Sequence, residues 1–415
     1  MVLIRRCAAA ALLIPALLGT TATAGQEMDS VSNAPGSNVL EIPESFFLPT
    51  TLTIAGAPVQ IGGTARIEYD DNIYAQAFDT VDDEKLLIRP RIALLPSSGA
   101  LQLSALAEGD FRKFRRHGSE DTAGGLIKTA TIWTPSATDR VTFLSGWQRI
   151  TEDRGEPEGL TTRRTGPRQI DTIDADLGYA TQGPRFGFSL RGTAATYRYV
   201  DIVDRNRDLD NFALVSRASY RLSPLLNGFA EGFGQRRNFT FQRLPGEVDR
   251  DSNTYGGRLG LSIDPGGALH GEAAVGVYRF TPRDQRLDGR TGLSMQAALV
   301  FTPRARTAFT LDGFIGNVAT YRTGAQSRED TRIRLGVQQE VRHNLRWQAS
   351  AIYRRSRYYG TGVTDDIYGG TFEAEYALNR RAALALVTRY AKRDSTAPLS
   401  EFSRLRVGLE LRGHY

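Results

Sequence analysis

The 415-residue chain has very few of the side chains that carry redox, metal or nucleophilic chemistry. Its single cysteine is Cys7, and it has only four histidines. Cys7 lies near the start of the chain and lacks the leucine-led box of small residues that marks a lipoprotein. The remainder of the chain has no thiol, which excludes disulfides, thiolate metal sites and cysteine nucleophiles.

Long hydrophobic runs are absent as well. The longest apolar run, residues 7–18, is shorter than the roughly 20 residues that a membrane-spanning helix needs. Arg5 and Arg6 precede this run, and the small residues Ala22-Thr23-Ala24 follow it. This order predicts a signal peptide at residues 1–24 and export through the general secretory pathway.

Lysine is scarce, although the chain is mildly basic. There are 52 Lys and Arg against 46 Asp and Glu, and loss of Arg5 and Arg6 lowers the formal charge from +6 to +4. Only four of the 52 are lysines, so 48 are arginines. Arginine keeps its charge in partly buried places and binds carboxylates through a planar fork, which favours a charged ladder inside a lumen. A high genomic GC content is the alternative explanation.

What the chain has instead is a period-two alternation of apolar and polar residues from residue 62 onward, in segments of about ten residues. The last segment shows it well, because Leu405, Val407, Leu409 and Leu411 share one face while arginines and Glu410 share the other. Such alternation predicts β-strands. The mean hydropathy of −0.33 resembles that of a soluble protein, but the two faces of an alternating strand cancel in that average.

The connections between these segments alternate between short and long, as they do in outer-membrane barrels. Eight short turns and nine long loops predict eighteen strands, with sixteen as the alternative. The predicted fold is an all-β, transmembrane, antiparallel up-and-down β-barrel at residues 62–415, preceded by an irregular periplasmic leader or plug segment at residues 25–61. A propeller is disfavoured because the loops alternate strictly and a Trp-Asp blade motif is missing. The expected short turns lie at residues 96–99, 134–137, 182–184, 223–224, 264–267, 302–304, 342–344 and 378–380, and the long loops lie near residues 71–84, 113–124, 151–169, 201–210, 241–252, 281–288, 322–328, 359–365 and 394–400.

The candidate functional residues are the charged side chains that the alternation places inside the barrel. They can form a ladder that braces the wall, or a field that selects anions, because rings of charge in a narrow pore select by sign. Both can hold together. The predicted pore-lining residues are Arg89, Arg91, Arg191, Arg217, Arg221, Arg258, Arg332, Arg334, Arg346, Arg354, Arg404, Arg406, Arg412, Glu340, Glu373, Glu375 and Glu410, and further acidic residues expected on this face are Glu68, Asp174, Asp176, Glu272 and Asp312.

Enzymatic and metal chemistry have little support in the sequence. His117 is the one histidine in a predicted outer loop, and its charged neighbours are better explained as a solvated loop than as a catalytic site. Asp70-Asp71-Asn72 and Asp365-Asp366 offer oxygen ligands, but their spacing matches no calcium loop. We therefore expect no catalytic residues, metal, cofactor or nucleic-acid partner.

The opening strand, from Gly63 to Tyr74, ends in Tyr69-Asp70-Asp71-Asn72. This pattern resembles the first strand of the putative β-barrel porin 2 family, and the resemblance covers residues 62–415. Members of that family are often encoded beside exopolysaccharide synthesis genes, which implies a role in secreting an extracellular polymer. The strand number and inward arginines also resemble the alginate exporter, in architecture only. At the other end, Leu409, Leu411 and Tyr415 resemble the C-terminal signal read by the barrel assembly machinery, with Tyr in place of the usual Phe.

The leading hypothesis for function is passive conduction of an anionic exopolysaccharide through an arginine-rich lumen, with periplasmic polysaccharide export proteins as partners. The first alternative is a general or anion-preferring diffusion porin for small solutes, which requires a loop folded inward, with 151–169 as the candidate. A non-conducting anchor or a barrel enzyme is the third. Each places the chain in the Gram-negative outer membrane, in contact with lipid and lipopolysaccharide.

Overall fold

The computed structural model describes residues 52–54, 57–95, 99–159, 166–240, 248–322 and 324–414. The predicted signal peptide at 1–24, Tyr415 and most of the predicted leader lie outside these residues. The described part consists of strands and two short 3-10 helices: β1 (Leu52–Ile54), β2 (Ala57–Asp70), β3 (Asp83–Leu94), β4 (Leu101–Phe114), η4 (Gly118–Glu120), β5 (Thr122–Trp133), β6 (Asp139–Thr151), β7 (Gln169–Gln182), β8 (Phe186–Tyr199), η5 (Ile202–Arg207), β9 (Leu209–Arg221), β10 (Leu226–Phe239), β11 (Ser252–Ile263), β12 (Leu269–Pro282), β13 (Arg290–Arg304), β14 (Thr307–Val318), β15 (Ser327–Arg342), β16 (Leu345–Tyr359), β17 (Thr364–Asn379), β18 (Ala382–Ser395) and β19 (Phe402–His414). No helix among these residues is long and apolar enough to cross a bilayer.

Strands β2 to β19 form one closed antiparallel barrel. Each strand pairs with the next along the chain, and β19 pairs with β2 to complete the ring. The prediction of eighteen strands is confirmed. β2 begins at Ala57, five residues before the expected start of the barrel, and β1 adds a short pairing to its first residues. Because the strand number is even, β2 begins and β19 ends at the same end of the barrel.

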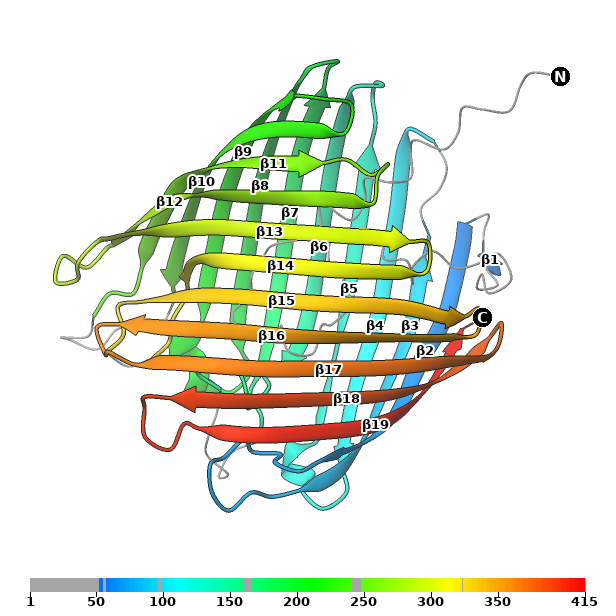
Figure 1. The fold of residues 1–415 in the computed structure, drawn as a ribbon. Helices are drawn as coiled ribbons and strands as arrows, with labels where there is room; N and C mark the ends of the chain where they lie inside the picture. Colours follow the sequence, from blue (N-terminus) through cyan, green and yellow to red (C-terminus); the bar gives the residue numbers. More distant parts are fainter. Residues whose placement is uncertain are drawn as a thin grey trace.

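The strands are tilted, as closure of a sheet into a barrel requires. In Figure 1 the strands from β13 to β19 form the front wall and run across the direction of β2 to β8 in the back wall. The short turns lie at one end of the barrel and the long loops at the other. We call these the short-turn end and the long-loop end.

The wall is apolar outside and charged inside, the reverse of a water-soluble protein. On β19, Leu409 and Leu411 are 58% and 51% exposed, whereas Glu410 between them is 3% exposed. Exposed aromatic side chains lie near both ends of the outer surface, for example Trp133 and Phe186 near the short turns and Tyr69 near the long loops. This pattern is typical of a lipid-facing belt flanked by aromatic girdles.

The predicted connections are confirmed wherever the structure describes them, with two displacements. The turn expected at 378–380 lies later, because β17 continues to Asn379 and β18 begins at Ala382. We expected a turn at 302–304, but β13 continues to Arg304 and β14 begins at Thr307. The register shifts between Phe301 and Arg304, which is a local irregularity that contains Pro303. Proline has no N–H to donate to a neighbouring strand, so it is tolerated in a strand at such an irregularity.

Candidate functional site: a charged lumen crossed by a loop

The strand register places all seventeen predicted pore-lining side chains on the inner face. Residues paired across neighbouring strands share a face, so Arg332 on β15, Arg354 on β16 and Ile367 on β17 all point into the barrel. The same reasoning places the other arginines and glutamates there, together with the five further acidic residues. Tyr197 and Tyr358 also lie on this face, so these two tyrosines do not belong to the aromatic girdles.

Several charged side chains of the inner face are more exposed near the short turns than near the long loops, although smaller residues of that face are buried at both ends. Near the short turns, the side chains of Arg346 and Glu272 are 41% and 40% exposed. Near the long loops, those of Arg328 and Asp70 are 1% and 0% exposed. Among the described residues, the charged groups of the lumen are therefore packed together toward the long loops, and several of them are accessible toward the short turns.

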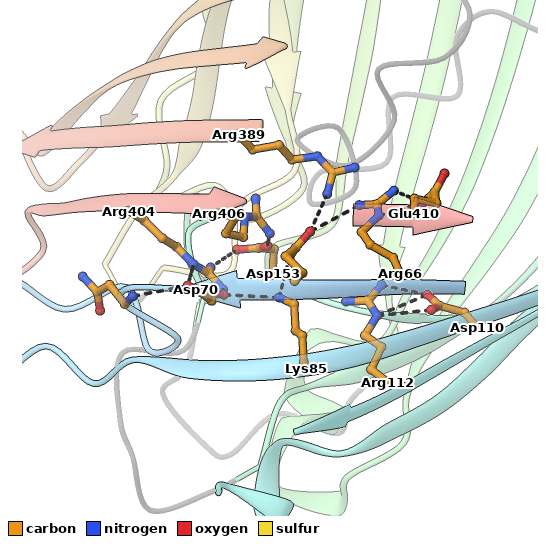
Figure 2. Close-up of polar contacts among 12 residues, drawn as sticks. Arg66, Asp70, Lys85, Asp110, Arg112, Asp153, Arg389, Arg404, Arg406 and Glu410 are labelled. Atoms are coloured by element: carbon orange, nitrogen blue, oxygen red, sulfur yellow. Dashed lines mark hydrogen bonds and ion pairs between the residues drawn. The ribbon is translucent and has the colours of Figure 1, made fainter. Parts of the chain in front are cut away.

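A continuous chain of ion pairs runs from β16 and β17 to the seam where β19 meets β2 and then along that seam, and Figure 2 shows its part from Glu410 to Asp153. Neighbouring members of the chain approach within 3.2 Å of one another. Positive and negative groups alternate along it, so each buried charge has a partner of opposite sign, as buried charges require. From the short-turn end its members are Arg346, Glu375, Arg412, Glu410, Arg66, Glu68, Lys85, Asp70, Arg404 and Asp153.

Asp153, at the end of this chain, belongs to the loop between β6 and β7 rather than to the wall. We call residues 152–159 the inward loop. Its carboxylates contact β15 and β16, and in a ring of eighteen strands these lie nine strands from β6 and β7 in either direction. The inward loop therefore crosses the full width of the lumen.

The first half of the inward loop is bound to β18 and β19. The Asp153 carboxylate accepts hydrogen bonds from Arg404 and Arg406, each at 2.8 Å. The guanidinium of Arg393 donates to the carbonyl oxygens of Gly155 and Glu156, at 2.7 and 2.5 Å. The contacts to the backbone hold the path of the loop, and the contacts to the side chain neutralise its carboxylate.

The second half is bound to the opposite side of the barrel. The Glu156 carboxylate lies 3.0 Å from the Arg354 guanidinium, which also holds Asp330. Glu158 lies 3.3 Å from Arg328 and accepts a hydrogen bond from the backbone N–H of Tyr321 at 2.6 Å. These contacts close the long-loop end of the lumen along the line of the loop.

The inward loop also changes the charge of the lumen. It carries four carboxylates, Glu152, Asp153, Glu156 and Glu158, and one guanidinium, Arg154. Asp153 and Glu156 bind wall arginines that were predicted to line the pore, and Glu158 binds Arg328 on the same inner face. The fourth carboxylate, Glu152, differs from these three in its ionisation. Burial raises the pKa of its carboxyl above the ordinary range, while Arg207 and Arg168 oppose that shift.

A separate charged cluster lies on the inner face of β9 to β12. Arg217 pairs with Glu231 at 2.9 Å and with Glu272 at 2.7 Å, and Arg258 also pairs with Glu231. The Arg217 guanidinium lies 3.9 Å from the centre of the Phe229 ring. This cluster spans four neighbouring strands and braces the wall.

Several residues of the site were not singled out in the sequence analysis, namely Arg66, Lys85, Arg328, Arg393, Asp153, Glu156 and Glu158. The four basic residues lie in alternating strands, so extending the alternation to the strand ends identifies them. The acidic residues of the loop have no such periodicity. Their signal is the density of charge in residues 152–158, Glu-Asp-Arg-Gly-Glu-Pro-Glu.

The other candidates from the sequence have simpler surroundings. The Nδ1 atom of His117 lies 2.8 Å from the Asp83 carboxylate, beside the Tyr74 ring. In the described part of the chain, no group of His, Cys, Asp and Glu side chains could hold a metal ion. Leu409 and Leu411 face outward, while Tyr415 lies outside the described residues, so the assembly signal stays a prediction.

Comparisons with known proteins give one match by sequence and several by fold. The model of a family described as Putative beta-barrel porin 2 matches residues 62–415. No curated protein matches the chain. Among solved structures, OpdK of Pseudomonas aeruginosa with vanillate has a TM-score of 0.45 and 11% identity, covering 86% of this chain and 99% of that one. OccK11 (OpdR) of P. aeruginosa has a TM-score of 0.45 and 11% identity over 86% and 96% of the two chains. The FrpB iron transporter of Neisseria meningitidis (F5-1 variant) has a TM-score of 0.44 and 10% identity, covering 82% of this chain and 64% of that one. This chain therefore spans less than two thirds of FrpB.

Proposed function

Since this chain belongs to the Putative beta-barrel porin 2 family, we propose that it is a diffusion channel for small solutes in the Gram-negative outer membrane. The observation that carries this proposal is the inward loop, which crosses the lumen and is bound on both sides. A loop in this position limits the solute to one that fits beside it. A polymer of greater width has to displace at least six charge-assisted hydrogen bonds first.

The accessible arginines in the short-turn half of the lumen favour anions over cations, although Glu272 is exposed there as well. Arg91 and Arg221 are exposed on the inner face near the short turns, and Arg346 is half-exposed there. Arginine keeps its charge in such a place, and accessible positive charge along a pore favours the passage of anions. The proposed solutes are therefore small anions, such as carboxylates and short acidic oligosaccharides.

Export of an anionic polysaccharide is the second candidate. The accessible arginines at the short-turn end support it, because a polyanion that enters there contacts successive guanidinium groups. This function requires the inward loop to move aside during passage. The loop carboxylates are held in ion pairs with arginines of the wall, so the loop has no evident cause to leave by itself. Periplasmic export proteins would have to supply that movement.

Single-channel recording in a planar bilayer tests both candidates. For the small-solute channel we expect a steady, anion-selective current that short acidic oligosaccharides reduce and long ones leave unchanged. For the exporter we expect long acidic chains to block the current from the short-turn side. An absence of current from both the wild type and a variant with a released loop would overturn both pore functions.

The variant Glu156→Gln, Glu158→Gln removes two of the carboxylates that bind the far wall, and we expect it to conduct more than the wild type. Glu84→Gln is the matched control. Glu84 is also a carboxylate paired with an arginine, Arg115 at 2.5 Å, but both side chains are exposed and face outward. An equal rise in conductance for the two variants would contradict a role of the inward loop in limiting the pore.

A further inference from the structure

The Tyr69-Asp70-Asp71-Asn72 sequence lies where the barrel closes and where the inward loop is attached. Asp70 is the last residue of β2, and its side chain is fully buried between Arg404 and Lys85. Asp71 binds the backbone of β19 instead, since its carboxylate accepts a hydrogen bond from the N–H of Leu405. Asn72 fixes the following turn through the carbonyl oxygen of Gln76 and reaches Ser403 on the other side of the seam.

The guanidinium of Arg404 joins this sequence to the inward loop. Its Nε and Nη2 atoms donate to the two oxygens of Asp70, at 2.9 and 2.6 Å. Its remaining nitrogen, Nη1, donates to Asp153 at 2.8 Å. A bidentate contact of this kind fixes the plane of the guanidinium, so Asp70 determines the direction in which Nη1 points. Figure 2 shows Arg404 between the two carboxylates.

The surroundings of Arg404 leave it little freedom to hold Asp153 in another way. Its side chain is 6% exposed, and that of Asp70 is 0% exposed. Without the Asp70 carboxylate, the guanidinium would be a buried charge that keeps only one partner, which favours its reorientation toward water. Arg406 also binds Asp153, through its Nη1 atom at 2.8 Å.

We infer that Asp70 is a positioning residue for the pore: it orients Arg404, Arg404 holds Asp153, and this relay keeps the inward loop across the lumen. The inference rests on the proposed function where it concerns pore size. Its structural half, the position of the loop, can be measured without any current. The same sequence that closes the barrel at the seam thus sets the width of its opening.

The loop position can be measured with a single cysteine, because Cys7 is the only cysteine in the chain. In the full chain carrying Cys7→Ser, Pro157→Cys places a thiol in the buried part of the inward loop. The rate of its reaction with a charged, water-soluble thiol reagent reports how often the loop leaves its site. We expect Asp70→Asn and Asp153→Asn each to raise this rate about tenfold or more, because each breaks a buried ion pair.

Asp71→Asn is the matched control. It removes a carboxylate from the neighbouring position, and this carboxylate bonds the seam backbone and does not contact Arg404. We expect its labelling rate to stay within about twofold of the parent, the scatter that separates an uncoupled site from a coupled one. A rise as large as that of Asp70→Asn would show that general weakening of the seam releases the loop, and would overturn the relay.

The double variant Asp70→Asn, Asp153→Asn separates a relay from two independent effects. If Asp70 acts through Arg404 on Asp153, the double variant labels no faster than Asp153→Asn alone, because the interaction is already absent. Rates that multiply would overturn the relay. Should Asp70→Asn fail to form a barrel, Arg404→Lys replaces it, because an ammonium cannot make the two parallel hydrogen bonds to Asp70 that fix the direction of a guanidinium. An unchanged labelling rate in Arg404→Lys would also overturn the relay.

Conductance recorded on the same variants distinguishes this inference from the proposed function. If labelling rises while no variant conducts, the relay is correct and the pore function is wrong. If the wild type conducts and Asp70→Asn changes neither labelling nor conductance, the pore function stands and the relay is wrong. We expect both quantities to rise together in Asp70→Asn and Asp153→Asn.

Discussion

Glu152 and Asp153 are neighbouring carboxylates whose surroundings give them opposite effects on the inward loop. Asp153 receives hydrogen bonds from two arginines, so its negative charge stabilises the loop in the lumen. Glu152 is 6% exposed and lies 3.4 Å from its nearest arginine partner, Arg168. Burial raises the pKa of the Glu152 carboxyl, which means that its charged form disfavours the buried position of the loop.

The sign of this effect gives a prediction for Glu152→Gln. A carboxyl whose pKa is raised in the folded state stabilises that state only while it is protonated, and the stabilisation is lost as the pH rises through the raised pKa. At neutral pH, Glu152→Gln should therefore keep the thiol at position 157 at least as protected as in the parent, whereas Asp153→Asn exposes it. The labelling rates of parent and Glu152→Gln should converge as the pH falls toward 4.5, the ordinary pKa of a glutamic acid.

Faster labelling of Glu152→Gln at neutral pH would mean that the ion pair with Arg168 outweighs the cost of burial. The control is the same pair of measurements on Asp153→Asn, whose labelling should be fast at neutral pH. The contrast between two adjacent positions removes any general effect of lowering the negative charge of the loop.

Strands are the level at which the sequence was most informative. A strand with one face toward lipid and one toward a charged lumen must alternate, and a register error of one residue would exchange the two faces. Inner and outer residues, and with them the charged set from Arg89 to Arg412, could therefore be predicted. The contacts that attach the inward loop to the wall could not be predicted in this way. Asp153 and Arg404, for example, are 251 residues apart, and a local sequence pattern does not indicate which distant residues meet.

The same alternation predicts that one substitution has different costs on the two faces. Leu409→Arg on β19 places a charge on the lipid-facing surface, where the side chain is 58% exposed. An arginine facing lipid near the middle of the bilayer costs about 2–4 kcal/mol of folding free energy. Leu126→Arg on β5 places it in the lumen opposite Glu108, where we expect a much smaller cost.

Denaturant titration of the barrel in lipid vesicles measures both free energies of unfolding. Equal losses for Leu409→Arg and Leu126→Arg would contradict the assignment of the outer and inner faces. A larger loss of unfolding free energy for Leu126→Arg than for Leu409→Arg would mean that Leu126 faces the lipid and not the lumen.

For the molecule as a whole, the balance of charge differs between the two halves of the lumen. The carboxylates of the inward loop bind wall arginines at the long-loop end, where Asp70, Asp330 and Arg328 are also buried in ion pairs. At the short-turn end Arg91, Arg221, Arg346 and Glu272 are accessible to a passing ion. Ion selectivity is therefore expected to arise in the short-turn half, while the long-loop half limits size.

Two arginines of β16 allow a matched test of this division. Arg346 faces the lumen near the short turns, is 41% exposed and pairs with Glu375 at 2.5 Å. Arg355 faces outward, is 44% exposed and pairs with Asp366 at 2.7 Å. Both residues lie on the same strand and bind a carboxylate of β17, so replacing either by Glu changes the net charge equally and breaks one similar ion pair.

We expect Arg346→Glu to shift the reversal potential in a salt gradient toward cations, and Arg355→Glu to leave it unchanged. The shift should grow as the salt concentration falls, because a charge acts over about 10 Å at 0.1 M salt and over a longer distance in dilute salt. Equal shifts in the two variants would mean that selectivity follows the net charge of the whole protein. If neither variant shifts the potential, ions do not pass Arg346, and the conducting path must be sought away from β16.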